Sequence, residues 1–176
     1  MRNSNVNTQT MDNTNFNWDA VPFFRELTHT NNLARQNKFT FCCVSGLEGF
    51  EEALHKLQNH TAFVCVSDIA KGYMAIDNAP HTRRVKTVFL AMRHKMDDME
   101  ARQNRFDTMR ELFRQFMTVL IQEKTRLEQN CIYLESRIQF NEIERFFFAG
   151  CACAFFNITV TVQTDLRYDP AEWNIP

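Results

Sequence analysis

The chain has 176 residues, of which 44% are apolar and 23% are charged, and its formal net charge is −1. A chain of this length can bury one core without metals or disulfides. Its balance of 20 Lys and Arg against 21 Asp and Glu provides neither a basic field for nucleic acid nor an acidic field for cationic partners. With four Gly and four Pro, long linkers are not expected, and the 17 Phe supply either an aromatic core or a surface that a partner covers.

No segment has the length and apolarity of a membrane span or a secretory signal. A span requires about 20 apolar residues, whereas the longest run, 146–156, is shorter and contains Gly150. The N-terminal segment has no apolar core of the kind that directs secretion. We therefore expect a cytoplasmic protein without a membrane partner, whose six cysteines are reduced, buried thiols. Their even number leaves disulfides open.

Residues 1–17 contain six Asn and little to bury, so we expect a disordered arm. Translation could start at Met1 or at Met11, and both are compatible with this composition. The rest of the chain, 18–176, shows no internal repeat and is expected to form a single domain.

The first half of this domain alternates between helical and strand patterns. Apolar residues at helical spacing predict a helix over 19–36, and alternation predicts a strand over 38–45. A short amphipathic helix is expected over 47–59. Strands over 62–67 and 72–77 are expected to pair with each other, and a further strand covers 83–93.

The second half contains one long helix followed by strands. No Gly or Pro interrupts 96–127, where apolar residues recur at spacings of three, four and seven. Strands are expected over 132–140, 142–148 and 151–166, and the short connection at Gly150 favours antiparallel pairing. This order predicts an α+β fold, with a mainly antiparallel sheet and helices, including the long one, packed on one face.

Motifs of the common enzyme classes are missing from the sequence. There is no GxGxxG, GxxxxGK[ST], GxSxG or HExxH pattern. Cys42 and Cys43 are adjacent and Cys151 and Cys153 are two apart, which is not the spacing of a structural zinc site, so we interpret them as core thiols. The five histidines are scattered, and nothing selects a Cys/His pair. We therefore assign no catalytic, cofactor-binding or metal-binding residue, and expect no cofactor.

Two clusters of charged residues are explained by the structural elements on which they lie. Arg84 and Lys86 share one face of the strand predicted over 83–93, where they could meet phosphates or an acidic partner. We interpret this strand as a sheet edge protected by charge. We expect no nucleic-acid binding, because no aromatic residues alternate with the basic ones as in a single-strand binder. Asp97 and Asp98 precede the long helix, where negative charge is favourable to the helix dipole.

The order of these elements and their residue patterns resemble those of the tail-completion and tail-terminator proteins of phages and prophages. The segments that carry the likeness are the first helix, FTFCCV at 39–44, AFVCVSDIAKGYMAID at 62–77, the strand and long helix at 84–124, and FFNITVTVQTDLRYDPAEW at 155–173. The likeness covers about residues 18–173. It implies a small virion subunit without enzymatic activity, which assembles as a ring with itself and with other virion proteins, first in the host cytoplasm and then in the virion, and takes no small-molecule substrate.

A ring subunit needs two different surfaces that complement each other. We expect its partner contacts at Arg84, Lys86, Phe147 and Trp173, because three consecutive Phe place aromatic groups on both faces of a strand and Trp173 ends a polar tail. Burial of the Phe run within the domain is equally compatible with the pattern. Two other functions stay open: a small cytosolic enzyme with a pocket of dispersed Cys, His and Glu residues, and a regulatory module that binds through the basic strand.

Overall fold

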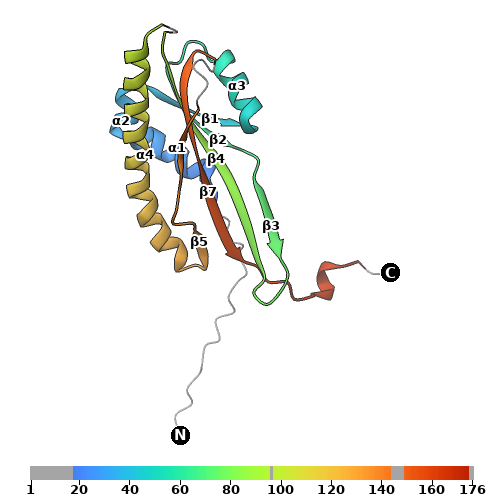
Figure 1. Ribbon diagram of the computed structural model, residues 1–176. Helices are drawn as coiled ribbons and strands as arrows, with labels where there is room; N and C mark the ends of the chain where they lie inside the picture. Colours follow the sequence, from blue (N-terminus) through green and yellow to red (C-terminus); the bar gives the residue numbers. More distant parts are fainter. Residues whose placement is uncertain (1–17, 96, 144–148, 175–176) are drawn as a thin grey trace.

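The computed structural model describes residues 18–95, 97–143 and 149–174. These residues form an α+β fold in which helices cover a mixed sheet of seven strands (Figure 1). The disordered arm predicted over 1–17 lies outside the described residues.

The helices and strands follow one another in an order close to the predicted one. The helices are α1 Ala20–Thr30, α2 Asn32–Gln36, α3 Gly46–Lys56, α4 Met99–Glu128 and a 3-10 turn, η1, at Pro170–Glu172. The strands are β1 Phe39–Val44, β2 Ala62–Ser67, β3 Lys71–Ala75, β4 His81–Arg93, β5 Ile132–Leu134, β6 Phe140–Glu142 and β7 Cys151–Gln163.

Two long antiparallel strands form the middle of the sheet. β4 and β7 have 13 residues each and pair along their whole length, from His81 with Gln163 to Arg93 with Cys151. One edge of β4 pairs with β2 over Val88–Met92 and with β3 over His81–Val85. The far edge of β7 pairs with β5 and β6, and β1 completes the other side by pairing with β2. Only the β1–β2 pair is parallel among the described strands, because α3 connects those two strands as a crossover.

Alternate residues of the sheet build two separate cores. The larger core contains Val88, Leu90 and Met92 of β4 and is covered by α1, α2 and α4. The smaller core contains Phe89 and Ala91 of the same strand and is covered by α3. The expectation of helices on one face therefore holds for α1, α2 and α4, while α3 lies on the opposite face, as Figure 1 shows.

The segment predicted as one helix over 19–36 is divided at Asn31. Asn31 has an extended backbone with φ of −69° and ψ of 127°, and its side-chain oxygen accepts a hydrogen bond of 2.8 Å from the Ala34 amide. Its amide group also donates to Gln115 of α4 at 2.8 Å. Asn31 thus ends α1, caps α2 and attaches the corner to the long helix.

The predicted pairing of 62–67 with 72–77 is wrong. Both β2 and β3 pair with β4, one beyond the other along the same edge. The physical reason is the length of β4, which offers enough backbone groups for both strands, while β1 occupies the other edge of β2. The interpretation of 83–93 as a charged edge strand is wrong for the same reason, because β4 is paired on both sides.

The predicted long helix is confirmed, and the strands after it are shorter than expected. α4 begins where the Asp98 side chain accepts from the Ala101 amide at 2.8 Å, so Asp98 has the helix-start role assigned to it. The strand predicted over 132–140 is instead two three-residue strands, β5 and β6, separated by irregular chain. The strand predicted over 142–148 lies mostly outside the described residues.

Candidate protein interface

Four of the cysteines lie in or beside the smaller core. The Sγ atoms of Cys42 and Cys65 are 2.7 Å apart on the paired strands β1 and β2. Their hydrogen bond lowers the pKa of the Cys42 thiol, whereas the same bond and burial raise the pKa of Cys65. Cys151 and Cys153 share a face of β7; the Cys153 hydrogen bond lowers the pKa of Cys151, and burial raises that of Cys153. The structure thus brings these thiols next to one another rather than next to a base.

The other two cysteines differ from the expectation of buried thiols. Cys43 and Cys131 are exposed: Cys43 lies near the end of β1, and Cys131 occupies the turn after α4 with φ of 56°. Among the described residues, no three His, Cys, Asp or Glu side chains lie close enough together to hold a metal ion.

A small surface pocket lies where the start of α1 crosses β4 and β7. Its volume is about 30 Å³, far below that of a ligand site, and it is lined by Trp18, Asp19, Ala20, Arg84, Lys86, Ile158 and Val160. Two of the predicted partner residues therefore line the same pocket. The Lys86 amine already pairs with Asp19 at 3.2 Å and donates to the Asp68 carbonyl at 3.2 Å, and its side chain is only 16% exposed.

The remaining predicted partner residues, Phe147 and Trp173, are not among the described residues that line this pocket. Phe147 lies outside the described residues. Trp173 follows η1 near the C-terminus and is 60% exposed. The structure thus brings Arg84 and Lys86 together and does not bring Trp173 to them, so Trp173 belongs to a different surface.

An uncovered strand edge is a second exposed surface that sequence reasoning missed. β1 covers β2 from end to end, but in the part of the chain that the structure describes no strand pairs with the outer side of β3. Next to these backbone groups, Tyr73 is 54% exposed, Met74 51% and Ile76 79%. We call these three residues and the β3 backbone the β3 edge. The signal in the sequence was GYMAI, apolar residues on a strand whose neighbour was misassigned.

Cationic groups lie around the β3 edge. The guanidinium of Arg83 lies 6.0 Å from the centre of the Tyr73 ring and pairs with Glu135 at 3.0 Å. The rings of Tyr73 and His81 meet edge to face at 5.9 Å. Lys71 begins the strand, and Arg84 pairs with Gly72 across the β3–β4 ladder. The β3–β4 hairpin therefore has more basic than acidic groups.

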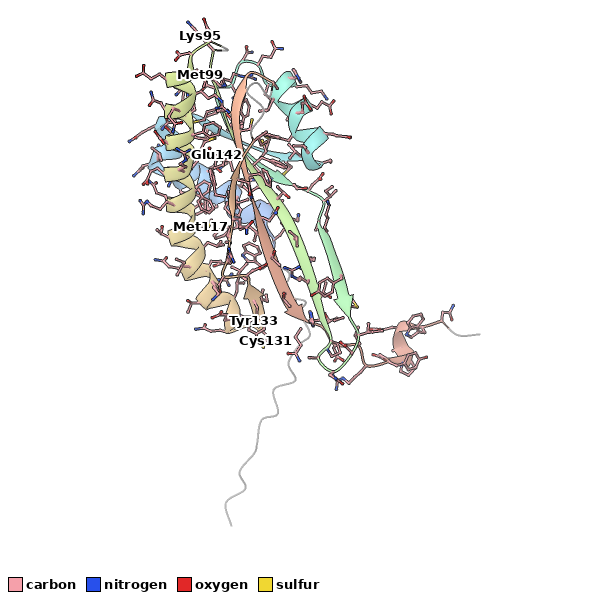
Figure 2. The ribbon with its side chains drawn as sticks, in the orientation of Figure 1. Lys95, Met99, Met117, Cys131, Tyr133 and Glu142 are labelled. Atoms are coloured by element: carbon pink, nitrogen blue, oxygen red, sulfur yellow. The ribbon has the colours of Figure 1, made fainter. Side chains whose placement is uncertain are left out.

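A third exposed surface is the C-terminal arm, residues 165–174, which are all exposed. It leaves the sheet where the Thr164 amide donates to the Pro80 carbonyl at 3.0 Å. The rings of Tyr168 and Trp173 stack on each other at 6.3 Å while both stay exposed to solvent. In Figure 1 the arm turns away from the sheet beside the β3–β4 hairpin, and in Figure 2 its side chains stand clear of the other elements.

The charge on the C-terminal arm is opposite to that on the hairpin. The arm has three carboxylates and one arginine. The Arg167 guanidinium binds the Asp165 carboxylate and lowers its pKa to about 2, which keeps Asp165 ionised. The arm thus combines apolar rings with net negative charge.

Comparison with known protein families and with curated protein sequences gave no match to this chain. In the described part of the chain, none of the helices is both long and apolar enough to cross a membrane.

Proposed function

We propose that the protein is a structural subunit without enzymatic activity, of the type that completes or terminates phage tails, and that it acts by assembling with copies of itself and with other virion proteins. In this proposal it is made in the host cytoplasm and becomes part of the virion. The order of its elements, on which the resemblance rests, supports this type of subunit.

The observation that carries the proposal is the apolar surface at the end of the sheet that the β3–β4 hairpin forms. Large apolar side chains of the β3 edge and of the C-terminal arm are exposed there, and the β3 backbone has an uncovered edge. Exposed edges and apolar patches promote association, so natural proteins keep them mainly where a partner covers them. A subunit that functions only in an assembly has a use for both features.

The two other functions have weaker support. For an enzyme, four of the six thiols lie against each other or in the smaller core, Cys43 and Cys131 are exposed, and the pocket beside α1 is small. For a regulatory module that binds through the basic strand, Lys86 and Arg83 already form ion pairs with Asp19 and Glu135 within the chain.

Light scattering coupled to size-exclusion chromatography tests the proposal. We expect a defined oligomer, or an apparent mass that rises with protein concentration, and closed rings in negative-stain electron microscopy. A protein that stays strictly monomeric at high concentration contradicts the proposal.

A further inference from the structure

The β3 edge and the C-terminal arm both need a partner, and their properties match each other. The arm presents Leu166 at 43% exposure, Tyr168 at 64% and Trp173 at 60%. The β3 edge presents three large apolar residues of similar exposure. The ten consecutive exposed residues of the arm are stabilised little by contacts within their own molecule, because they bury almost no apolar area to offset the conformational entropy lost on ordering.

Charge complementarity points to the same pairing. The arm has Asp165, Asp169 and Glu172 against Arg167. The hairpin, over 71–85, has Lys71, Arg83 and Arg84 against Asp77. Arg83 is paired with Glu135 and Arg84 lines the pocket beside α1, so Lys71 is the exposed positive charge of the β3 strand itself. Opposite net charges on two exposed apolar surfaces favour contact between them and disfavour contact of either surface with itself.

The arm has the reach to contact another molecule. A fully extended segment of ten residues spans at most about 33 Å, and the arm is somewhat shorter because η1 turns within it. The arm is tied to its own molecule at Pro80 and runs away from its own sheet beyond that point (Figure 1). Its backbone is extended on both sides of η1, with φ and ψ of −113° and 113° at Asp169 and of −122° and 129° at Trp173.

We propose that the C-terminal arm of one copy packs its Leu166, Tyr168 and Trp173 against the β3 edge of a second copy. This inference rests on the proposed function and deepens it, because it names the two surfaces through which copies join. The two surfaces are different, so the contact is heterologous. Repeated contacts of this kind close into a ring when the rotation from one copy to the next is a whole-number fraction of 360°.

Three variants test the contact. The arm variant is a chain that ends at Thr164, which keeps the hydrogen bonds of Thr164 to Pro80 and Thr82. The edge variant is Met74→Asp with Ile76→Asp, which places carboxylates opposite an acidic arm. The control is Tyr133→Ala: Tyr133 is 50% exposed on β5, at the other side of the sheet, and is labelled in Figure 2. Circular dichroism and thermal unfolding show that each variant is folded.

Light scattering of the separate variants gives the first result. We expect the wild type and the control to form the same oligomer, and the arm and edge variants to be monomers at the same concentration. The single change Trp173→Ala should weaken association about tenfold or more, as expected for a central aromatic contact. An arm variant that keeps the full oligomer overturns the inference and leaves the proposed function standing. A monomeric wild type overturns both.

Mixing the two monomeric variants gives the second result. The arm variant keeps an intact β3 edge, and the edge variant keeps an intact arm. We expect an equimolar mixture to form a pair of one copy each that does not grow, because only one contact can form. The pair has one contact whereas each copy in a ring has two, so the mixture is measured up to concentrations well above that at which the wild type assembles. A mixture that stays monomeric there overturns the inference.

Discussion

At the scale of single residues, Arg93 connects three segments that sequence patterns do not link. Its guanidinium donates to four backbone carbonyls: Leu54 at 2.6 Å, His60 at 2.8 Å, Ala149 at 3.1 Å and Leu57 at 3.2 Å. A guanidinium has five N–H donors in a fixed planar arrangement, so it can satisfy several loop carbonyls at once. Arg93 thus holds the end of α3, the chain before β2 and the turn before β7 on the end of β4.

We expect Arg93→Ala to lower the free energy of unfolding by about 3 kcal/mol, because four carbonyls lose a charged donor. The cation–π contact with Phe63 at 5.5 Å is lost as well. Arg93→Lys should recover only part of the lost free energy of unfolding, since an ammonium group cannot reproduce the planar arrangement of five N–H donors. Urea unfolding measures both. The control Arg114→Ala removes an exposed ion pair with Glu111 and should change the free energy of unfolding by less than about 0.5 kcal/mol. Equal effects of Arg93→Ala and Arg114→Ala contradict the role of Arg93.

Trp18 is a second residue whose contact depends on a distant segment. Its indole Nε1 donates to the Glu123 carboxylate of α4 at 2.9 Å. The hydrogen bond from Arg126 lowers the pKa of Glu123 below its ordinary value of 4.5, and the Trp18 bond contributes in the same direction. A carboxyl group whose pKa is lower in the folded state stabilises the fold above its ordinary pKa. That stability is lost as the pH falls through the lowered value.

We therefore expect the environment of Trp18 to change on acidification below about pH 4.5. Tryptophan fluorescence measures this in a Trp173→Phe background, which leaves Trp18 as the single tryptophan. Adding Glu123→Gln should remove the part of the pH dependence that belongs to this contact, because the amide oxygen accepts the indole bond without titrating. An unchanged fluorescence titration in that variant contradicts the assignment.

At the scale of elements, Gly72 fixes how closely β3 approaches β4. Gly72 pairs with Arg84, and a Cβ built on it would overlap the carbonyl oxygen of Arg83. The neighbour is backbone, so the ladder itself has to move. We expect Gly72→Ala to separate β3 from β4 and to raise hydrogen exchange of the β3 amides, while the amides of β7 stay protected.

Gly49 provides a matched control for this change. A Cβ at Gly49 would lie 3.5 Å from the Ser45 Cβ, which is an ordinary contact, and Gly49 is inside α3. Gly49→Ala should therefore stabilise the protein by up to about 1 kcal/mol through helix propensity. Hydrogen exchange at β3 that is the same in both variants contradicts the proposed role of Gly72.

The elements that could be predicted from the sequence are those whose pattern depends on local spacing. The long helix and the alternation of β7 are of this kind, because their apolar period is set by one buried face. The division at Asn31 depends on a hydrogen bond to Gln115, more than 80 residues away, and no local pattern contains it. The pairing of β2 and β3 with β4 depends on strand length and on the position of β1, which only the assembled sheet defines.

The exposure of the candidate interface residues follows only in part from sequence patterns. Trp173 was selected because a large aromatic residue in a polar tail has no local core to enter, and it is exposed. Arg84 and Lys86 were selected by charge, but they line the pocket beside α1, where Lys86 is bound to Asp19. Met74 and Ile76 were missed, since their exposure follows from the absence of a strand beside β3 in the described chain. Whether any of these residues contacts a partner stays a prediction.

At the scale of the whole molecule, the sheet has two unlike ends. At one end β2, β4 and β7 are covered by helices on both faces and the smaller core lies there, while the larger core continues along α4 as far as β5. At the other end β4 continues with β3 beside it, and the C-terminal arm emerges next to the hairpin (Figure 1). The two cores stabilise the fold, and residues 71–85 of the hairpin belong to neither of them, so the hairpin can carry apolar and charged groups for contacts between molecules.

Because the arm and the hairpin have opposite net charge while the whole chain has a net charge of only −1, association should be sensitive to salt. Raising NaCl from about 0.1 M to about 1 M shortens the Debye length from about 10 Å to about 3 Å. We expect the wild-type oligomer to dissociate at a severalfold higher protein concentration in the high salt, measured by sedimentation velocity. Glu172→Gln with Lys71→Gln should reduce this salt dependence. Lys56→Gln, which changes an exposed lysine of α3 paired with Glu52, should not. Association that is equally strong at both salt concentrations contradicts a contact guided by these charges.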